Sequence, residues 1–141
     1  MTFLPDNPPV IVDAGVAVEL AVGERTDVPA LWEAWLARDR MLLAPAVPWT
    51  DVGHALLRHA GRSAAEAARR IGRLQAAGIE TVDRGPDGVR MALDLAQRHR
   101  LTVHDATYLF LAMDVDGELA TLDRDLARAA RAEGVPLALE P

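Results

Sequence analysis

Four aspartates stand where predicted helices begin, and these residues are the ones in the sequence best suited to chemistry. Asp13 directly follows the apolar run VIV, and Asp123 directly follows ELATL. Asp51 lies in PAVPWTDVGHALLR and Asp105 in LTVHDATYLFLA, each near the start of a segment with helical spacing. If VIV and ELATL are parallel strands of one sheet, Asp13 and Asp123 emerge at its carboxyl edge, where open α/β sheets bind ligands.

Each aspartate also has a simpler, structural explanation. Asp13 and Asp123 could be helix N-caps, which contribute about 1 kcal/mol each. Thr102 and Asp105 match the pattern of a capping box, and Asp51 could complement a helix dipole. The coincidence of four such acids near one predicted edge favours a shared site over four unrelated caps.

A group of carboxylates at one edge requires a counter-charge. Two carboxylates about 5 Å apart repel by roughly 3 kcal/mol at an effective dielectric constant of about 20. Ligation by oxygen atoms alone selects a hard cation such as Mg²⁺ or Mn²⁺, which keeps several waters and leaves room for phosphate oxygens. We therefore predict a divalent-metal site formed by Asp13, Asp105 and Asp123, with Asp51 bound directly or through a water.

Other polar residues accompany the acids. His54 and Arg58 follow Asp51 at helical spacing on one polar strip, so Arg58 is a candidate for holding a flanking phosphate and His54 a weaker candidate for contacting substrate. The alternative is a solvated arginine and a packing histidine. Thr121, two residues before Asp123, is expected to hydrogen-bond within the acidic edge.

The elements that must position these residues follow from the periodicity of apolar residues. Short runs rich in Val, Ile and Leu alternate with Ala-rich amphipathic segments, which is the pattern of a parallel sheet covered by helices on both faces. Strands are predicted at residues 10–12, 41–44, 79–82, 118–122 and 136–139. Helices are predicted at about residues 14–22, 28–38, 48–59, 64–78, 86–99, 104–113 and 124–132.

Apolar residues within two of the predicted helices lead to further expectations. In the helix at 104–113, the expected buried stripe consists of Ala106, Leu109, Phe110 and Met113. In the helix at 28–38, Trp32, Trp35 and Leu36 either pack on the sheet or face a partner protein, and core packing is the favoured alternative.

Composition limits the class of protein. The chain has 141 residues, half of them hydrophobic, which suits one domain over residues 1–141 with a loose arm at residues 1–9. There are no cysteines, so disulfides and thiolate metal sites are excluded. We expect a soluble cytoplasmic protein, because no signal-like segment or membrane-length apolar run is visible. The net charge of −6 argues against a uniformly basic nucleic-acid-binding surface.

All 15 basic residues are arginines, and the missing lysine helps to exclude two other classes. Receiver domains and haloacid-dehalogenase-type phosphatases also place aspartates at strand ends, but both normally neutralise the phosphoryl group with a lysine. The phosphatases also need a second aspartate two residues after the first, where this chain has Gly15.

Four segments together resemble the PIN-domain family, and in particular the VapC-type toxins of bacterial toxin–antitoxin pairs: VIVDAGVAVEL, LLAPAVPWTDVGHALLR, LTVHDATYLFLAM and LATLDRDLARAARAEGVPL. The resemblance covers residues 10–139. It implies a three-layer α/β/α fold with a parallel five-stranded sheet, an acidic Mg²⁺ site and endonucleolytic cleavage of RNA. Asp13, Asp105 and Asp123 match the family's metal-site aspartates, whereas Asp51 stands where the family usually has glutamate.

The resemblance also implies a mechanism and partners. A water activated by one or two Mg²⁺ ions, with Mn²⁺ as a substitute, would hydrolyse RNA to leave 5′-phosphate and 3′-hydroxyl ends. The expected partners are a small cognate antitoxin protein and a second copy of the chain in a homodimer. Two departures from the family bear on activity: the shorter side chain at Asp51, and Gly15, where the family commonly has a hydroxyl residue. The alternative function is therefore a catalytically impaired PIN-like domain that acts as a protein-binding module.

Overall fold

The computed structural model describes residues 7–141 of the chain except residues 24, 26, 47 and 60–62. Helices and strands alternate along it as the sequence predicted, and no predicted element is missing from the described residues. The strands are β1 (Val10–Val12), β2 (Leu42–Ala44), β3 (Ile79–Thr81), β4 (Glu118–Ala120) and β5 (Leu137–Leu139). The helices are α1 (Ala14–Val22), α2 (Asp27–Ala37), α3 (Pro48–His59), α4 (Ala64–Ala76), α5 (Gly85–His99), α6 (Val103–Asp114) and α7 (Arg124–Ala132).

The five strands form one parallel sheet in the order β3-β2-β1-β4-β5. The chain builds outward from β1 to β2 and β3 on one side, and then crosses back to place β4 and β5 on the other. The strand order therefore reverses between β1 and β4. A crevice outside the carboxyl ends of the strands at such a switch point is the usual ligand site of open α/β sheets.

Alternation along the central strand divides the core in two. Val10 and Val12 of β1 point to one face of the sheet and Ile11 to the other, as the two-residue period of a strand requires. Val10 and Val12 belong to a core formed with α1–α4, and Ile11 belongs to a core formed with α5–α7. All three residues are at most 2% exposed, so burial on both faces explains the uninterrupted apolar run.

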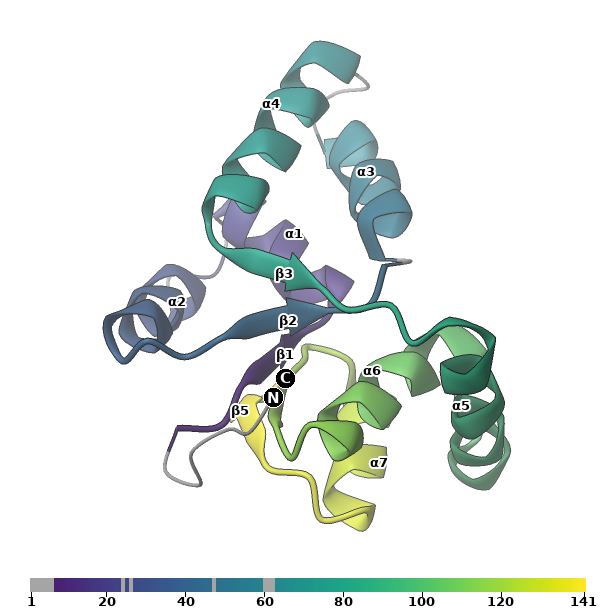
Figure 1. Cartoon of the computed structure of the whole chain (residues 1–141). Helices are drawn as coiled ribbons and strands as arrows, with labels where there is room; N and C mark the ends of the chain where they lie inside the picture. The colour runs from purple at the N-terminus through teal and green to yellow at the C-terminus, as the bar shows by residue number, and fades with distance from the viewer. Residues whose placement is uncertain (1–6, 24, 26, 47, 60–62) are drawn as a thin grey trace.

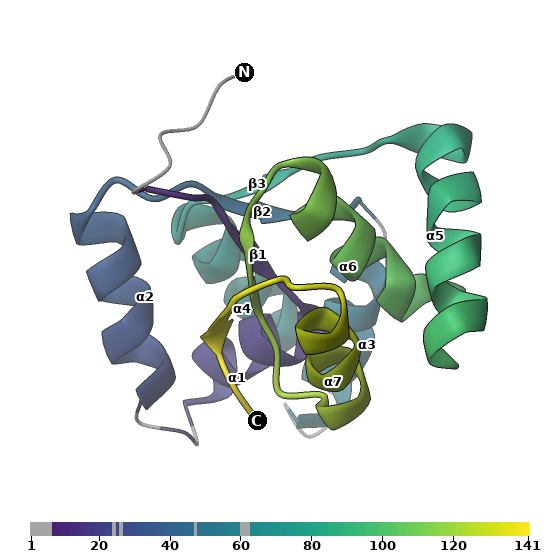
Figure 2. The ribbon, with the colours of Figure 1, turned by 90° about the horizontal axis from the view of Figure 1, so that it is seen from below.

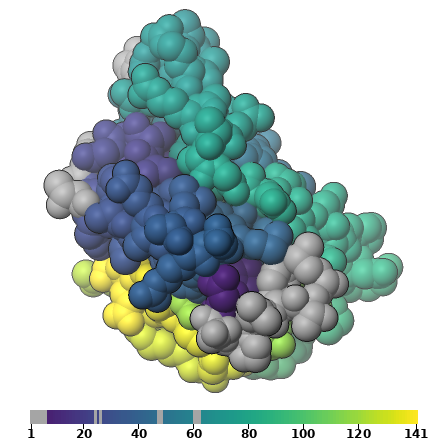
Figure 3. Space-filling view, turned by 60° about the vertical axis from the view of Figure 1, so that its left-hand side comes forward, coloured from purple at the N-terminus to yellow at the C-terminus, as the bar shows by residue number. Residues whose placement is uncertain are grey.

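The two groups of helices cover opposite faces of the sheet, which gives a three-layer α/β/α architecture. In Figure 1, α1, α3 and α4 lie above the sheet, and α5, α6 and α7 lie below it. Figure 2 shows α2 and α5 at opposite ends of the molecule. In the space-filling view of Figure 3, α4 forms the end of the molecule above α1 and α2. The expected fold class is confirmed.

Some details differ from the sequence-based expectations. Met113 was predicted to be buried but is 38% exposed, whereas Tyr108 and Leu111, which were not predicted, are 2% exposed. Because α6 packs against α5, α7 and the sheet, it is covered on more than one side, and this buries Tyr108 and Leu111 outside the predicted stripe. Phe110 is half-buried, and the prediction that Ala106 and Leu109 are buried is confirmed.

The tryptophans of α2 settle one of the open alternatives. Trp32 and Trp35 are 3% and 5% exposed and belong to the core, and the Trp32 indole N–H donates to the Ala77 carbonyl at 3.0 Å. Core packing is therefore confirmed for both. Leu36, which was grouped with them, is 43% exposed.

The predicted N-terminal arm is attached to the fold at its last residues. The carbonyl of Pro9 accepts from the Glu118 N–H at 2.9 Å, and the carbonyl of Pro8 accepts from the Arg40 guanidinium at 2.9 Å. Arg40 also pairs with the Glu118 carboxylate at 3.0 Å. The prediction of a loose arm is therefore wrong at residues 8 and 9. Residues 1–6 lie outside the described part of the chain.

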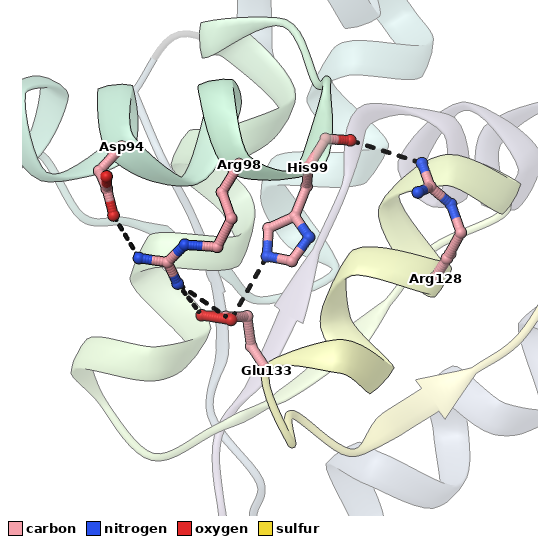
Figure 4. A network of polar contacts seen from close by, with 5 residues as sticks. All are labelled: Asp94, Arg98, His99, Arg128 and Glu133. Atoms are coloured by element: carbon pink, nitrogen blue, oxygen red, sulfur yellow. Dashed lines mark hydrogen bonds and ion pairs between the residues drawn. The ribbon is translucent and has the colours of Figure 1, made fainter.

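A polar network ties α5 to α7 (Figure 4). Glu133, which directly follows α7 and is only 13% exposed at its side chain, lies 2.7 Å from the Arg98 guanidinium and 3.3 Å from the His99 imidazole. Arg98 also pairs with Asp94, and the Arg128 guanidinium donates to the His99 carbonyl at 3.5 Å. The network therefore connects α5 to α7, and both helices also pack against α6. Within the described residues, no helix is long and apolar enough to cross a bilayer.

Candidate acidic site

Each of the four aspartates is held at the N-terminus of a different helix. Asp13 is the N-cap of α1, and its Oδ1 accepts from the Val16 N–H at 2.9 Å. Asp123 is the N-cap of α7, and its Oδ1 accepts from the Leu126 N–H at 2.9 Å. Asp51 and Asp105 lie in the first turns of α3 and α6. The capping explanation is therefore correct for Asp13 and Asp123, but it does not account for where the four residues meet.

All four aspartates line one cavity of about 330 Å³. It lies beyond the carboxyl ends of β1 and β4, where the strand order reverses, because Asp13 follows β1 and Asp123 lies three residues after β4. The lining residues are Asp13, Ala14, Gly15, Asp51, His104, Asp105, Tyr108, Leu122 and Asp123. The structure thus brings together the four acids that the sequence singled out.

A buried threonine joins the two strand-end aspartates. The Thr121 hydroxyl donates to Asp13 Oδ2 at 2.5 Å and accepts from the Asp123 N–H at 3.0 Å. Thr121 is fully buried and Asp13 is 6% exposed, so water does not replace these bonds. The expectation that Thr121 hydrogen-bonds within the acidic edge is confirmed.

The crowding of acids changes their protonation. Burial, together with the smaller effects of the charges of Asp123 and Asp105, raises the pKa of Asp13 to about 6, and the hydrogen bonds from Thr121 and Val16 oppose part of the rise. The pKa of Asp105 is also raised, first by burial and then by the charge of Asp123. The site therefore holds carboxylates whose charged forms would be stabilised by a cation.

The helix termini offset part of this repulsion. The four acids lie at the N-termini of α1, α3, α6 and α7, and all four line the cavity. The free N–H groups and the positive end of each helix dipole favour negative charge within the first turn. The helix N-termini can thus stabilise four carboxylates at one cavity without a lysine side chain, which the chain lacks.

Sequence reasoning missed two residues of the cavity, His104 and Tyr108. The His104 Nε2 atom lies 2.6 Å from Asp51 Oδ2, and its ring stacks on Tyr108 with centroids 6.3 Å apart and planes at 25°. The Tyr108 hydroxyl oxygen accepts from the Ala14 N–H at 3.2 Å, and burial raises the pKa of Tyr108 so that the phenol stays neutral. The four-residue spacing of the two rings was visible in the sequence, but the contact with Asp51 spans 53 positions and was not.

His54 and Arg58 do not line the cavity. Both lie exposed on α3, on the strip that begins at Asp51. The structure therefore brings Asp51 to the cavity without the two residues that were expected to accompany it. Their proposed substrate contacts stay predictions.

The lining residues fit a hard divalent cation in chemical kind. Carboxylate oxygens are the ligands that Mg²⁺ and Mn²⁺ prefer, and the buried Asp13 carboxylate with its raised pKa is a group that a cation would stabilise. Within the described residues, no three His, Cys, Asp or Glu side chains converge closely enough to hold an ion as they stand. Binding would therefore require side chains of the cavity to move.

Gly15 also lines the cavity, next to Asp13. A Cβ atom added to Gly15 would lie 3.5 Å from Asp13 Oδ1, an ordinary van der Waals contact. Its backbone φ is not positive, so the position can accept a side chain. The missing hydroxyl is therefore a property of this sequence and is not imposed by the fold.

The fold and the cavity define a class of protein: a parallel α/β/α domain with an acidic site at the switch point of its sheet. The sequence profile of the PIN domain matches residues 10–132, and the chain belongs to the PIN-domain family. No curated protein matches the chain at a significant level.

Several solved structures share this fold. A toxin–antitoxin complex from Klebsiella pneumoniae is 20% identical, with a TM-score of 0.69 over 94% of this chain and 99% of that one. VapBC2 from Rickettsia felis, bound to a DNA fragment of its promoter, is 10% identical, with a TM-score of 0.70 over 91% and 96%. The sarcin–ricin-loop-cleaving toxin VapC20 from Mycobacterium tuberculosis is 15% identical, with a TM-score of 0.68 over 85% and 94%. At these identities the likeness establishes the shared fold.

Proposed function

We propose that this chain is a Mg²⁺-dependent endoribonuclease and the toxin of a toxin–antitoxin pair. The observation that carries the proposal is the meeting of Asp13, Asp51, Asp105 and Asp123 at one cavity, with the pKa of Asp13 raised to about 6. Carboxylates crowded in this way are poor phosphate binders on their own, because they repel an anion. They become useful for phosphodiester chemistry when they hold a cation.

The chain's own residues have distinct roles in this proposal. Asp13, Asp105 and Asp123 would hold the ion, and Asp51 would bind it directly or through a water. Thr121 keeps the Asp13 carboxylate oriented through the hydrogen bond to Oδ2. A bound Mg²⁺ or Mn²⁺ ion would supply an activated water and would neutralise charge on the phosphate. Hydrolysis would leave 5′-phosphate and 3′-hydroxyl ends.

The proposed partners rest on the family and on the neighbours in fold. Two of the neighbours are toxin–antitoxin assemblies, and a third is described as cleaving the sarcin–ricin loop. We therefore propose an RNA substrate, a cognate antitoxin protein, a homodimeric assembly and a cytoplasmic location. Arg58, exposed on α3 below Asp51, is the proposed contact to a flanking phosphate, and His54 is a secondary one.

Two observations favour a second function, a protein-binding PIN-like domain with impaired catalysis. No three metal-ligating side chains of the described residues stand ready for an ion, and Gly15 supplies no hydroxyl beside Asp13. Such a domain would bind its partner without binding Mn²⁺. Metal binding therefore separates the two functions.

The test has two arms. Calorimetric titration of the wild type with Mn²⁺ at pH 7 should show binding with release of protons, because Asp13 is partly protonated without metal. Sequencing of RNA 5′-phosphate ends after brief induction should show new ends with the wild type and none with Asp13→Asn. Absence of Mn²⁺ binding by the wild type would contradict the catalytic function, and binding of an antitoxin without metal would then favour the second one.

A further inference from the structure

We propose that His104 is a positioning residue that holds the Asp51 carboxylate in place at the acidic cavity. The inference rests on the proposed function, because the contact matters only if Asp51 takes part in binding the ion. It assigns a task to a side chain that the sequence did not single out. It also explains how an exposed aspartate on α3 is kept beside three acids that belong to other elements.

The contact crosses the cavity between two helices from opposite layers. Asp51 lies on α3, which packs against α1 and α4, whereas His104 lies on α6, which packs against α5, α7 and the sheet. In Figure 1, α3 and α6 lie on opposite sides of the sheet. The 2.6 Å approach of His104 Nε2 to Asp51 Oδ2 therefore bridges the two layers at the site.

The imidazole ring is the fixed member of the pair. It stacks on Tyr108, which is 2% exposed and accepts a hydrogen bond from the Ala14 N–H. The backbone of His104 is also held, because its carbonyl accepts from the Thr107 hydroxyl at 2.6 Å, and Thr102 caps the helix one residue before Val103. Because the core holds the ring in this way, the ring can restrict the position of a side chain that contacts it.

Asp51 is the member that needs to be held. Its side chain is 49% exposed, against 32% for that of His104, and an exposed carboxylate exchanges among rotamers unless a neighbour restricts it. In the described part of the chain, the buried Nε2 atom makes no hydrogen bond of good geometry. Its close polar contact is the one with the Asp51 carboxylate. A neutral imidazole has one N–H donor, and with that donor on Nε2 the ring can donate to the Asp51 carboxylate.

Two substitutions test the N–H donor and the aromatic ring of His104 separately. His104→Phe keeps an aromatic ring on Tyr108 and removes the N–H, whereas His104→Gln keeps an N–H donor and removes the ring. We expect His104→Phe to weaken Mn²⁺ binding by about 10-fold or more, the range found for residues that orient metal ligands. His104→Gln should restore most of the affinity. The matched control is His59→Phe, at an exposed histidine of α3 outside the cavity.

A double-mutant cycle tests whether His104 acts through Asp51. Mn²⁺ affinity is measured by calorimetry for the wild type, Asp51→Asn, His104→Phe and the double variant. If His104 only positions Asp51, the double variant should bind no more weakly than Asp51→Asn, because the partner is already lost. Thermal unfolding of each variant checks that it is folded, and His104→Gln keeps the test valid if the Phe variant is unstable.

Several results would overturn the inference. Wild-type affinity in both His104 variants, or additive losses in the cycle, would remove the positioning role while leaving the proposed function intact. A ¹⁴N coupling from His104 in the electron paramagnetic resonance of bound Mn²⁺ would make it a direct ligand instead. Failure of the wild type itself to bind Mn²⁺ would remove both the proposed function and this inference.

Discussion

Asp13 and Thr121 are 108 positions apart in the chain, yet the threonine hydroxyl lies 2.5 Å from the aspartate Oδ2. Pairing of β1 with β4 brings them together, since Val12 is in register with Ala120 and the Asp13 N–H donates to the Ala120 carbonyl. One hydrogen bond therefore connects the strand pairing at the centre of the sheet to the most buried acid of the cavity.

Thr121→Val should destabilise the protein while preserving the shape of the side chain. The variant leaves the buried Oδ2 atom of Asp13 without its donor, at a cost of about 1–3 kcal/mol in the free energy of unfolding. Because the Thr121 hydrogen bond lowers the pKa of Asp13, its loss should raise that pKa above about 6. Urea unfolding at pH 8 measures the loss, and Thr121→Ser, which retains the hydroxyl, should show most of the wild-type stability.

Asp13→Asn should stabilise the metal-free protein above pH 6. The pKa of Asp13 is about 6 in the folded chain and 3.8 as the ordinary value, so the folded state binds the proton more tightly than the unfolded state does. Ionisation therefore lowers stability as pH rises through about 4 to 6, by about 3 kcal/mol in total. The neutral asparagine avoids this loss.

The comparison of unfolding free energies at pH 4 and pH 8 checks this prediction. The advantage of Asp13→Asn should be present at pH 8 and nearly absent at pH 4, where the wild-type acid is largely protonated when folded. An equal difference at both pH values would show that ionisation of Asp13 is not the cause.

Asp51→Asn should separate helix capping from site function. If Asp51 only complements the dipole of α3, the variant loses at most about 1 kcal/mol of stability and cleaves RNA normally. If Asp51 helps to hold the ion, the rate should fall by about 100-fold or more, as when an interaction of roughly 3 kcal/mol is lost from the transition state. Rates of RNA cleavage with Mn²⁺ measure the difference.

Asp51→Glu extends the same measurement to the longer side chain that is usual in the family. The variant should keep or raise the rate if the cavity accepts the added methylene. Unchanged rates in both Asp51 variants, beside an inactive Asp13→Asn, would leave three aspartates to form the site.

Glu133→Gln should weaken the attachment of α7 to α5. Glu133 is 13% exposed at its side chain and faces both Arg98 and His99, so the change removes the carboxylate that the two groups share and leaves Arg98 paired with Asp94 alone (Figure 4). We expect a loss of about 1–3 kcal/mol in the free energy of unfolding. Asp87→Asn, which removes an exposed pair with Arg90, is the control and should change stability by less than about 1 kcal/mol.

Much of this architecture was predictable from local sequence. The continuous apolar run at Val10–Val12 and the helical spacing that follows it gave β1 and α1 with correct bounds, because burial on both faces and capping by Asp13 are local signals. Met113 was predicted wrongly because the neighbours of α6 decide its exposure. The helical spacing within α6 does not indicate how α5, α7 and the sheet are placed around it.

The acidic residues of the cavity were foreseen for a topological reason. Parallel strands end at the same edge, so Asp13 and Asp123 had to approach one another once β1 and β4 were adjacent. The contact of His104 with Asp51 had no such signal, since it depends on how two helices from opposite layers are placed. Sequence patterns indicate which edge carries the site, but they do not show which side chains meet across it.

The position of β4 in the sheet also determines when during synthesis the parts of the site can come together. A ribosome makes β1 and Asp13 first, but it makes the neighbouring β4, together with Thr121 and Asp123, only after β2, β3 and α1–α6. A nascent chain that ends before β4 therefore carries Asp13 and Asp51 without the edge that would complete the cavity. The cavity with all four acids can therefore assemble only after β4, Thr121 and Asp123 have been synthesised.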